Sequence, residues 1–256
     1  PKLFDHPYSY FFQLPDGRIF FAIPYQQDFT LIGTTDRDQQ PGDPIRASDE
    51  EIAYLCEGAS RYFARTIKPA DVVWTYSGVR PLIDDGSGRP EAATRGYRLD
   101  LSEADKGAPL LSVYGGKITT YRHLAEEAVD MLAARLPALH GKPWTTSKPL
   151  PGGDFAVDGL EPLMHALAAD YPFLGEADVD RIARAYGTRA RQWLGDAQGW
   201  QALGRNFGAG LTSAEVNYLR VHEWARSAED VLWRRTKLGL RLTPAEQANL
   251  AEYLDK

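Results

Sequence analysis

The sequence predicts an α+β protein in which an antiparallel sheet comes first and a small all-helical domain comes last. Apolar, aromatic-rich runs separated by short turns dominate the chain up to about residue 136. Helical periodicity with recognisable helix starts dominates the chain after residue 155. The segment between them is rich in Pro, Gly, Thr and Lys, which is typical of a linker. We therefore expect a sheet domain over 1–136, a linker over 137–155 and a helical domain over 156–256.

Three strands and a helix are predicted near the start of the chain. Apolar runs lie on both sides of Pro15-Asp16-Gly17, and a third covers Phe29 to Ile32, a pattern typical of an antiparallel meander. We interpret Gly33-Thr34-Thr35-Asp36 as a turn that closes the third strand. Ser48-Asp49-Glu50-Glu51 is a capping box, so a helix is expected to begin there and to cover one face of the sheet. Further strands are expected over 72–79 and 94–100.

A strand, two glycines and a helix are predicted in succession from residue 110 onward. Leu110 to Tyr114 is a short apolar run, and Gly115-Gly116 ends it with residues that adopt positive φ at no steric cost. Thr119 and Thr120 offer side-chain oxygens to the first N–H groups of the helix. Such a corner presents backbone amides and a positive helix dipole, and Lys117 adds a full charge, which suits an anion or an electron-rich carbonyl. An ordinary tight strand–helix connection is the alternative.

Basic side chains stand at the ends of the predicted strands. Arg80 follows the run over 72–79, Arg95 begins the run over 94–100, and Lys117 follows the two glycines. If the strands share one sheet, the three cations would converge on one edge, where a guanidinium binds phosphate or carboxylate oxygens bidentately. The alternative is that each arginine forms a surface or interdomain ion pair.

The composition argues against several classes of protein. A net charge of −6 with scattered Lys and Arg is unlike a nucleic-acid binder. No apolar stretch approaches the ~18 residues of a membrane-spanning helix. The five histidines lack metal-ligand spacing, so no metal site is expected, and the single Cys56 fits a reducing cytoplasm. The chain opens at Pro1 in strand-like sequence, so we expect it to be a piece of a longer protein.

Helices are predicted throughout the second half. Thr212 with Glu215, Ser227 with Asp230, and Thr243-Pro244-Ala245-Glu246 are recognisable helix starts. The segment Trp233-Arg234-Arg235-Thr236-Lys237 is interpreted as a solvated or domain-docking helix face in preference to a binding patch. The expected helices are Leu160–Ala169, Ala177–Tyr186, Arg189–Leu194, Ser213–Trp224, Ser227–Arg235 and Pro244–Leu254.

A series of motifs resembles one known family, in order and along essentially the whole chain. They are IGTTD at Ile32 to Asp36, SGVRPL at Ser77 to Leu82, TRGY at Thr94 to Tyr97, LLSVYGGKITTYRHLAEEA at Leu110 to Ala128, LPGG at Leu150 to Gly153 and HEWARSAEDVLWRRTKLGL from His222. The chain resembles the C-terminal part of the aerobic, respiratory FAD-dependent glycerol-3-phosphate dehydrogenases. It lacks their N-terminal Gly-x-Gly-x-x-Gly region.

The resemblance implies a fold and an activity. Residues 1–136 would contain an antiparallel substrate-binding sheet and the last strand and helix of a Rossmann-like flavin domain, and a helical C-terminal domain would follow. The family oxidises sn-glycerol 3-phosphate to dihydroxyacetone phosphate by hydride transfer to FAD, with electrons passed to quinone. The isolated chain is expected to be inactive, because the main FAD-binding region would lie in the N-terminal FAD domain of the same protein. That domain would be its partner. A homodimer and a cytoplasmic, peripheral position at the inner face of the cell membrane are also implied.

The resemblance also implies roles for particular residues. Arg80 and Arg95 are candidates for the substrate anion, and Arg80 is the first choice for the phosphate. Lys117 is the catalytic candidate, facing either the substrate oxygens or the pyrimidine edge of the flavin. The candidates for cofactor contact are Gly115, Gly116, Lys117, Thr119 and Thr120.

Two other functions remain open at this point. A related FAD-dependent oxidase would act on an amino acid or a 2-hydroxy acid, whose carboxylate would bind Arg80. Alternatively, the isolated chain would be a non-catalytic module for docking or dimerisation.

Overall fold

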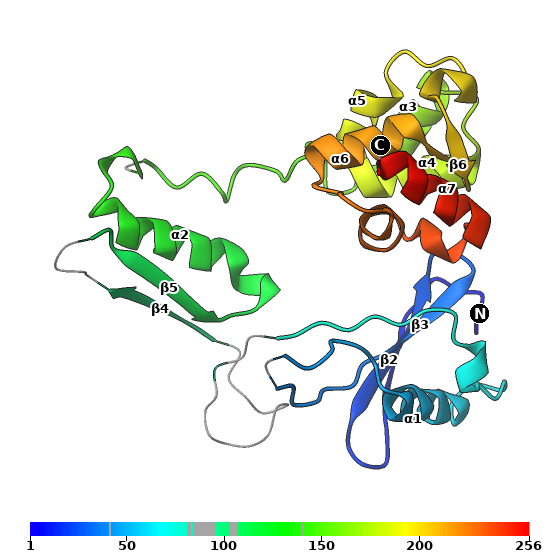
Figure 1. Ribbon diagram of the computed structural model, residues 1–256, viewed down its shortest axis with the longest axis horizontal. Helices are drawn as coiled ribbons and strands as arrows, with labels where there is room; N and C mark the ends of the chain where they lie inside the picture. Colours follow the sequence, from blue (N-terminus) through cyan, green and yellow to red (C-terminus); the bar gives the residue numbers. More distant parts are fainter. Residues whose placement is uncertain (41, 81–82, 84–95, 103–106, 140, 256) are drawn as a thin grey trace. The chain divides into compact units, whose positions relative to one another are not determined.

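The computed structural model describes the chain except residues 41, 81–82, 84–95, 103–106, 140 and 256. The chain forms two compact units, Pro1–Thr145 and Thr146–Lys256, and each is described by itself (Figure 1). Most paired strands lie in the first unit, and the second unit is mainly helical. The predicted order, a sheet first and helices last, is confirmed at this level.

The first unit begins with a three-stranded antiparallel sheet. Phe12 lies opposite Phe20, and Ala22 lies opposite Ile32, so adjacent strands run in opposite directions. The expected meander is therefore confirmed. In the order β1-β2-β3, its strands are β1 (Tyr10–Gln13), β2 (Ile19–Tyr25) and β3 (Phe29–Gly33).

Helix α1 (Asp49–Ser60) packs on one face of this sheet, as predicted (Figure 1). The capping box that starts it is also confirmed. The Glu51 N–H donates to Ser48 Oγ at 3.2 Å, and the Ser48 N–H donates to Glu51 Oε2 at 3.0 Å. A small apolar core lies between the helix and the sheet, because β2 alternates buried and exposed side chains. Its buried members are Leu14, Phe20, Cys56, Ala59 and Ile67.

The strand expected over 72–79 is absent. A short 3₁₀ helix, η1 (Pro69–Asp71), is followed by residues 72–80, which form neither helix nor strand. Val, Trp and Tyr favour a strand only where a partner strand lies beside them, because β propensity reflects packing on a pleated surface. None of the strands in the described part of the chain pairs with this segment.

A two-stranded antiparallel sheet follows, formed by β4 (Tyr97–Ser102) and β5 (Leu110–Gly115). Directly after β5 come the 3₁₀ turn η2 (Ile118–Thr120) and helix α2 (Tyr121–Ala133). The predicted succession of strand, glycines and helix is confirmed. A further 3₁₀ turn, η3 (Pro137–Leu139), comes after α2.

The second unit is a helical domain with its own core. Leu167, Ile182, Leu211, Val216, Val231 and Leu250 are fully buried in it. Its elements are α3 (Leu160–Asp170), α4 (Glu176–Tyr186), η4 (Gly187–Arg189), α5 (Ala190–Leu194), η5 (Trp200–Leu203), β6 (Asn206–Gly208), β7 (Leu211–Thr212), α6 (Ser213–His222), the π-helix η6 (Asp230–Arg235), η7 (Leu238–Leu240) and α7 (Pro244–Leu254).

The helices expected here are confirmed, with two differences in detail. The run over 227–235 forms a π-helix from Asp230, and the small β6–β7 hairpin was not predicted. The cap predicted at Thr243 is present, because Thr243 Oγ1 accepts from the Glu246 N–H. The cap predicted at Thr212 is wrong, since its side chain makes no capping bond.

Glu215 is fully buried and takes part in an ion pair between α4 and α6 instead of completing a cap. Its carboxylate accepts two hydrogen bonds from Arg181, at 2.6 and 3.0 Å, and one from the Tyr186 hydroxyl at 2.6 Å. Burial acts to lower the pKa of Arg181, but the Glu215 charge outweighs it and the pKa is raised. Removing one partner of such a pair costs roughly 3–5 kcal/mol, because the other charge stays buried.

The backbone of the LPGG motif, in the expected linker, contacts the backbone at the end of α4. The Thr188 N–H donates to the Gly152 carbonyl oxygen at 3.1 Å. A Cβ on Gly187 would overlap that same oxygen, and a Cβ on Gly152 would overlap the Tyr186 carbonyl oxygen. Both glycines have positive φ, 87° for Gly152 and 55° for Gly187. Glycine is therefore required here both for its backbone conformation and for the close approach.

Gly187→Ala is expected to destabilise the chain more than Gly195→Ala. The two glycines share one conformation, φ 55° and ψ −134° against φ 54° and ψ −134°, but no atom lies within 4 Å of a Cβ built on Gly195. This sparsely populated backbone conformation costs an alanine about 1–3 kcal/mol at either site, and overlap at Gly187 adds about 1–3 kcal/mol. Urea unfolding of both variants measures the difference, and equal losses would contradict the close contact.

Candidate functional site

The glycine corner between β5 and α2 is built by close approach of two backbones. Gly115 and Gly116 have φ of 73° and 101°, and the Gly116 N–H donates to the Gly96 carbonyl oxygen at 2.9 Å. A Cβ on Gly115 would lie 2.6 Å from that oxygen. The two glycines therefore let the chain turn sharply from β5 toward α2.

Lys117 stands at the start of the helical turn, but the two threonines do not cap it. The Thr120 hydroxyl donates to the Lys117 carbonyl oxygen at 3.0 Å, and neither η2 nor α2 has a side-chain capping bond. The predicted capping by Thr119 and Thr120 is wrong, because the threonine nearest the helix bonds backward. The first N–H groups of a helix lack intrahelical partners. An uncapped helix start beside exposed Lys117 can therefore meet an anion or an electron-rich carbonyl.

Arg80 lies in the irregular segment 72–80 and is held by a residue far away in the sequence. Its Nη1 donates to Asp36 Oδ1 at 2.8 Å, across 44 positions. The side chains are about half exposed, 49% for Arg80 and 40% for Asp36. The guanidinium therefore faces solvent while one edge is fixed to the end of the meander.

The segment that carries Asp36 is itself tied to α1. The Thr35 hydroxyl donates to Glu51 Oε1 at 2.6 Å, and Glu51 also belongs to the capping box of α1. The Thr35 hydroxyl is the largest cause that lowers the pKa of Glu51, followed by the Ser48 N–H. The sequence alone suggested only a strand-ending turn for 33–36. The only sequence signal for more was the IGTTD motif.

The predicted convergence of three cations is not established by the contacts of the described residues. Arg95 lies outside the described residues. Within those that are described, Arg80 pairs with Asp36, and no ion pair or hydrogen bond joins it to Lys117. A common rim formed by Arg80, Arg95 and Lys117 stays a prediction.

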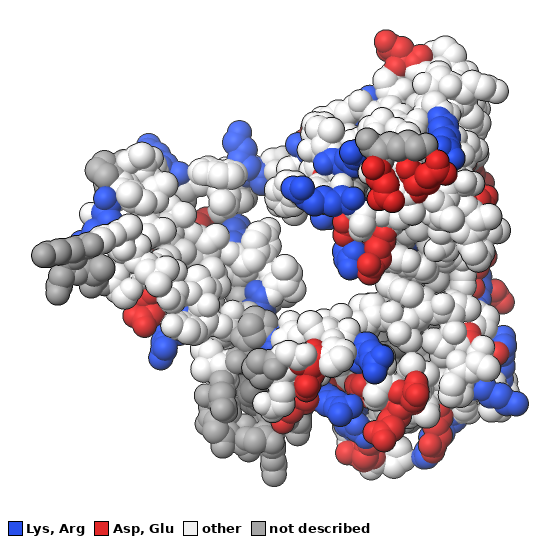
Figure 2. Space-filling view, viewed as in Figure 1, with Lys and Arg blue, Asp and Glu red and all other residues white. Residues whose placement is uncertain are grey.

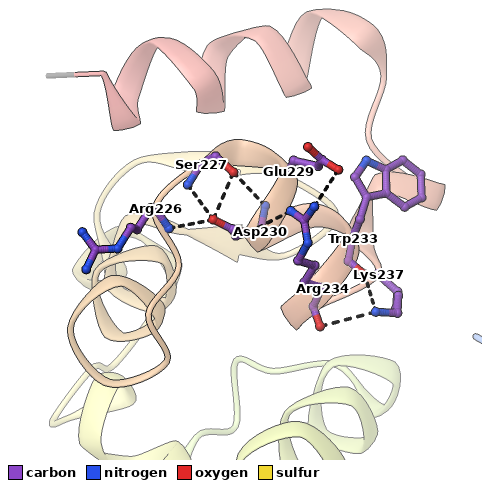
Figure 3. A network of polar contacts seen from close by, with 7 residues as sticks. All are labelled: Arg226, Ser227, Glu229, Asp230, Trp233, Arg234 and Lys237. Atoms are coloured by element: carbon purple, nitrogen blue, oxygen red, sulfur yellow. Dashed lines mark hydrogen bonds and ion pairs between the residues drawn. The ribbon is translucent and has the colours of Figure 1, made fainter. Parts of the chain in front are cut away.

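The basic segment in the helical unit is engaged in its own local network (Figure 3). Asp230 Oδ2 accepts from the N–H groups of Arg226 and Ser227, at 2.9 and 3.0 Å, and from the Ser227 hydroxyl at 3.0 Å. Arg234 donates to Asp230 Oδ1 at 2.8 Å and to Glu229 at 2.9 Å. Lys237 Nζ donates to the carbonyl oxygens of Trp233 and Arg234. Arg234 and Lys237 therefore serve the π-helix and are not free cations of a binding patch.

Three further observations concern the surface charges, metal-binding groups and membrane-spanning helices. Figure 2 shows Lys and Arg interspersed with Asp and Glu on the visible face. Among the described residues, no group of three or more His, Cys, Asp or Glu is arranged to hold a metal ion. In that same part of the chain, every helix is too short or too polar to cross a membrane.

Two family models match the chain and together cover most of it. Residues 2–122 match the FAD dependent oxidoreductase family, and residues 143–255 match the C-terminal domain of alpha-glycerophosphate oxidase. The chain belongs to this family of FAD-dependent oxidoreductases. The resemblance to the glycerol-3-phosphate dehydrogenases of that family is confirmed by its relatives.

The relatives are similar over the full chain but are about twice as long. Glycerol-3-phosphate dehydrogenase of Pseudomonas aeruginosa is 47% identical over 99% of this chain and 49% of its own length. D-erythritol 1-phosphate dehydrogenase of Brucella abortus is 43% identical, over 100% and 51%. Aerobic glycerol-3-phosphate dehydrogenase of Escherichia coli is 42% identical, over 99% and 50%. The chain therefore spans about half the length of each.

A solved structure is also similar. The glycerol-3-phosphate dehydrogenase of Bacillus halodurans, complexed with FAD, superposes with a TM-score of 0.68 and 25% identity. The match covers 96% of this chain and 52% of that one.

Asp230→Asn is expected to lower the free energy of unfolding at pH 7 by about 1–2 kcal/mol, as for loss of a helix cap. The Arg226 N–H is the largest cause that lowers the Asp230 pKa from 3.8 to about 2. Because the folded-state pKa is the lower one, the stabilisation is present above pH 3.8 and is lost as the pH falls through about 2. Urea unfolding of both proteins at pH 7 and at pH 2 measures this.

The control is Asp158→Asn, which removes an exposed carboxylate of the same unit. It should leave the stability unchanged at both pH values. A difference between wild type and Asp230→Asn that is the same at pH 7 and pH 2 would contradict the role given to the carboxylate.

Proposed function

We propose that this chain is the C-terminal portion of a flavoenzyme that oxidises sn-glycerol 3-phosphate to dihydroxyacetone phosphate. The observation that carries the proposal is the match of both family models, in order, together with relatives of that activity at 42% and 47% identity. FAD is the proposed cofactor, and the FAD-bound Bacillus halodurans structure supports it. The dinucleotide fingerprint is absent from this sequence, so the N-terminal half of the enzyme would supply it.

The proposal assigns successive parts of the chain to different regions of the enzyme. The meander β1–β3 would belong to the substrate-binding sheet, and β5 with α2 would be the last strand and helix of a Rossmann-like flavin domain. The segment 137–155 would link these to the helical domain, 156–256. The exposed faces of β5 and α2 support this, because α2 buries no residue and Leu110 of β5 is 63% exposed.

The residues of the glycine corner fit the electron-rich edge of a flavin. Gly115 and Gly116 allow the close approach of backbone, and the start of α2 supplies N–H groups and a positive dipole. Lys117 would add its charge, either toward the flavin or toward the substrate oxygens. FAD supplies the hydride acceptor when it is bound. Preorganised donors at this corner would stabilise negative charge that develops nearby.

Arg80 would bind the substrate phosphate, and Arg95 would assist it. A guanidinium has five N–H donors in a planar fork, and Asp36 takes only one of them at 2.8 Å. No hydrogen bond to the described residues engages the others, and a guanidinium binds phosphate oxygens bidentately. The half-exposed position of Arg80 supports access by a ligand.

Quinone would accept the electrons, and the enzyme would lie at the inner face of the cell membrane as a peripheral protein. The absence of a membrane-spanning helix among the described residues is compatible with this. Homodimerisation is proposed from the family resemblance alone.

A second candidate substrate is a longer polyol phosphate such as D-erythritol 1-phosphate. It is favoured by the 43% identical D-erythritol 1-phosphate dehydrogenase of Brucella abortus. Both substrates carry a phosphate for Arg80, so comparing kcat/KM for the two polyol phosphates separates the candidates. Glycine and lactate serve as carboxylate competitors that test the amino acid and 2-hydroxy acid alternatives.

Arg80→Ala in the full-length flavoenzyme is expected to lose about 2–4 kcal/mol of transition-state binding for glycerol 3-phosphate. This corresponds to a fall of about 30- to 1000-fold in kcat/KM, because a cation that binds the substrate anion is removed. Steady-state kinetics measure it.

Arg61→Ala is the matched control, since Arg61 is an exposed arginine directly after α1 that pairs with Glu57 at 2.6 Å. Its kcat/KM should stay at the wild-type value. Unchanged kcat/KM in Arg80→Ala would refute the phosphate role.

A further inference from the structure

We propose that Asp36 is a positioning residue that holds the Arg80 guanidinium in the orientation that binds the substrate phosphate. The inference deepens the proposed function and rests on the phosphate role of Arg80. No sequence signal assigned such a role to Asp36, because the two residues are 44 positions apart.

The geometry makes Asp36 the fixed end of the contact. Asp36 comes three residues after β3 ends at Gly33, and the neighbouring Thr35 is bonded to Glu51 of α1 at 2.6 Å. Glu51 is in turn held by the Ser48 N–H at 3.0 Å. Asp36 also lies outside helices and strands, but Arg80 is nine residues from the nearest described element, since η1 ends at Asp71. The ordered sheet and helix therefore fix the carboxylate, and the carboxylate fixes the arginine.

A tether of this kind matters because arginine is a flexible side chain. Immobilising such a side chain when a ligand binds opposes binding, and a side chain that is already held avoids most of that loss. The bond from Nη1 to Oδ1 holds one end of the guanidinium and so restricts the orientations that it can adopt. Among the described residues, no hydrogen bond engages Nε or Nη2, and these are the donors proposed to bind phosphate oxygens.

A purely electrostatic role and a positioning role predict opposite changes in phosphate affinity when the Asp36 carboxylate is removed. If Asp36 acted only through its charge, Asp36→Ala would strengthen phosphate binding, because a negative charge beside an anion site is repulsive. If it positions Arg80, Asp36→Ala weakens binding although the site becomes more positive. The direction of the change therefore decides between the two.

The experiment uses the full-length FAD-loaded enzyme with Asp36→Ala, Asp36→Glu and Arg80→Ala, and the Asp36→Ala/Arg80→Ala double variant. Asp36→Ala is expected to raise KM for glycerol 3-phosphate about two- to tenfold and to leave kcat unchanged. The Kd for dihydroxyacetone phosphate, measured by calorimetry, should rise by the same factor. Asp36→Glu retains the carboxylate and should recover part of the loss.

The double variant tests whether Asp36 acts through Arg80. In the Arg80→Ala background, Asp36→Ala should have no further effect on KM, since the group that it positions is gone. Glu57→Gln removes an exposed carboxylate of α1 that pairs with Arg61, and it should leave KM and kcat at their wild-type values. The flavin content and urea unfolding midpoint of Asp36→Ala should also match the wild type, because an exposed ion pair contributes little to stability.

The outcomes separate this inference from the proposed function. Unchanged kcat/KM in Arg80→Ala overturns the phosphate role of Arg80 itself. A loss in Arg80→Ala combined with an additive effect of Asp36→Ala, or with tighter binding in Asp36→Ala, overturns the positioning role alone. A loss of flavin or of kcat in Asp36→Ala also overturns it, because that result indicates a structural role.

Discussion

The ion pair between Arg80 and Asp36 is the contact on which the candidate site depends. Segment 72–80 has no secondary structure that would fix a side chain, and Arg80 is still held at 2.8 Å from Asp36 at the end of the meander. As a surface ion pair it adds little to the free energy of unfolding. Its effect is on orientation, since a guanidinium that is already held loses less conformational entropy when an anion binds.

The same use of charge for local order recurs in the helical unit. Asp230 accepts hydrogen bonds from N–H groups that precede the π-helix, and Lys237 donates hydrogen bonds to carbonyl oxygens at its end. Buried Glu215 joins α4 to α6 through Arg181 and Tyr186. The basic residues near the C-terminus are therefore largely explained by the fold of this unit, and the candidate chemistry lies in the first unit.

Sequence reasoning predicted the elements whose cause is local. The capping boxes at Ser48 and Thr243, the meander and the strand–glycine–helix corner follow from patterns within a few residues, and all four are present. Two of the predictions that failed depended on distant partners. The run over 72–79 has strand-forming residues but no partner strand in the described chain, and Glu215 was expected to complete a cap. The carboxylate pairs instead with an arginine 34 positions away.

The sequence by itself determined the order of the two units, the family and the identities of the candidate cations, because composition, periodicity and motifs are properties of short stretches. Only the tertiary structure decided what each charge contacts. Arg80 with Asp36, and Arg181 with Glu215, are chosen by how distant segments pack, and burial then sets how strongly each pair interacts. The threonines after Lys117 show the same limit at short range, since the backbone geometry of the turn directs Thr120 backward and leaves the helix start open.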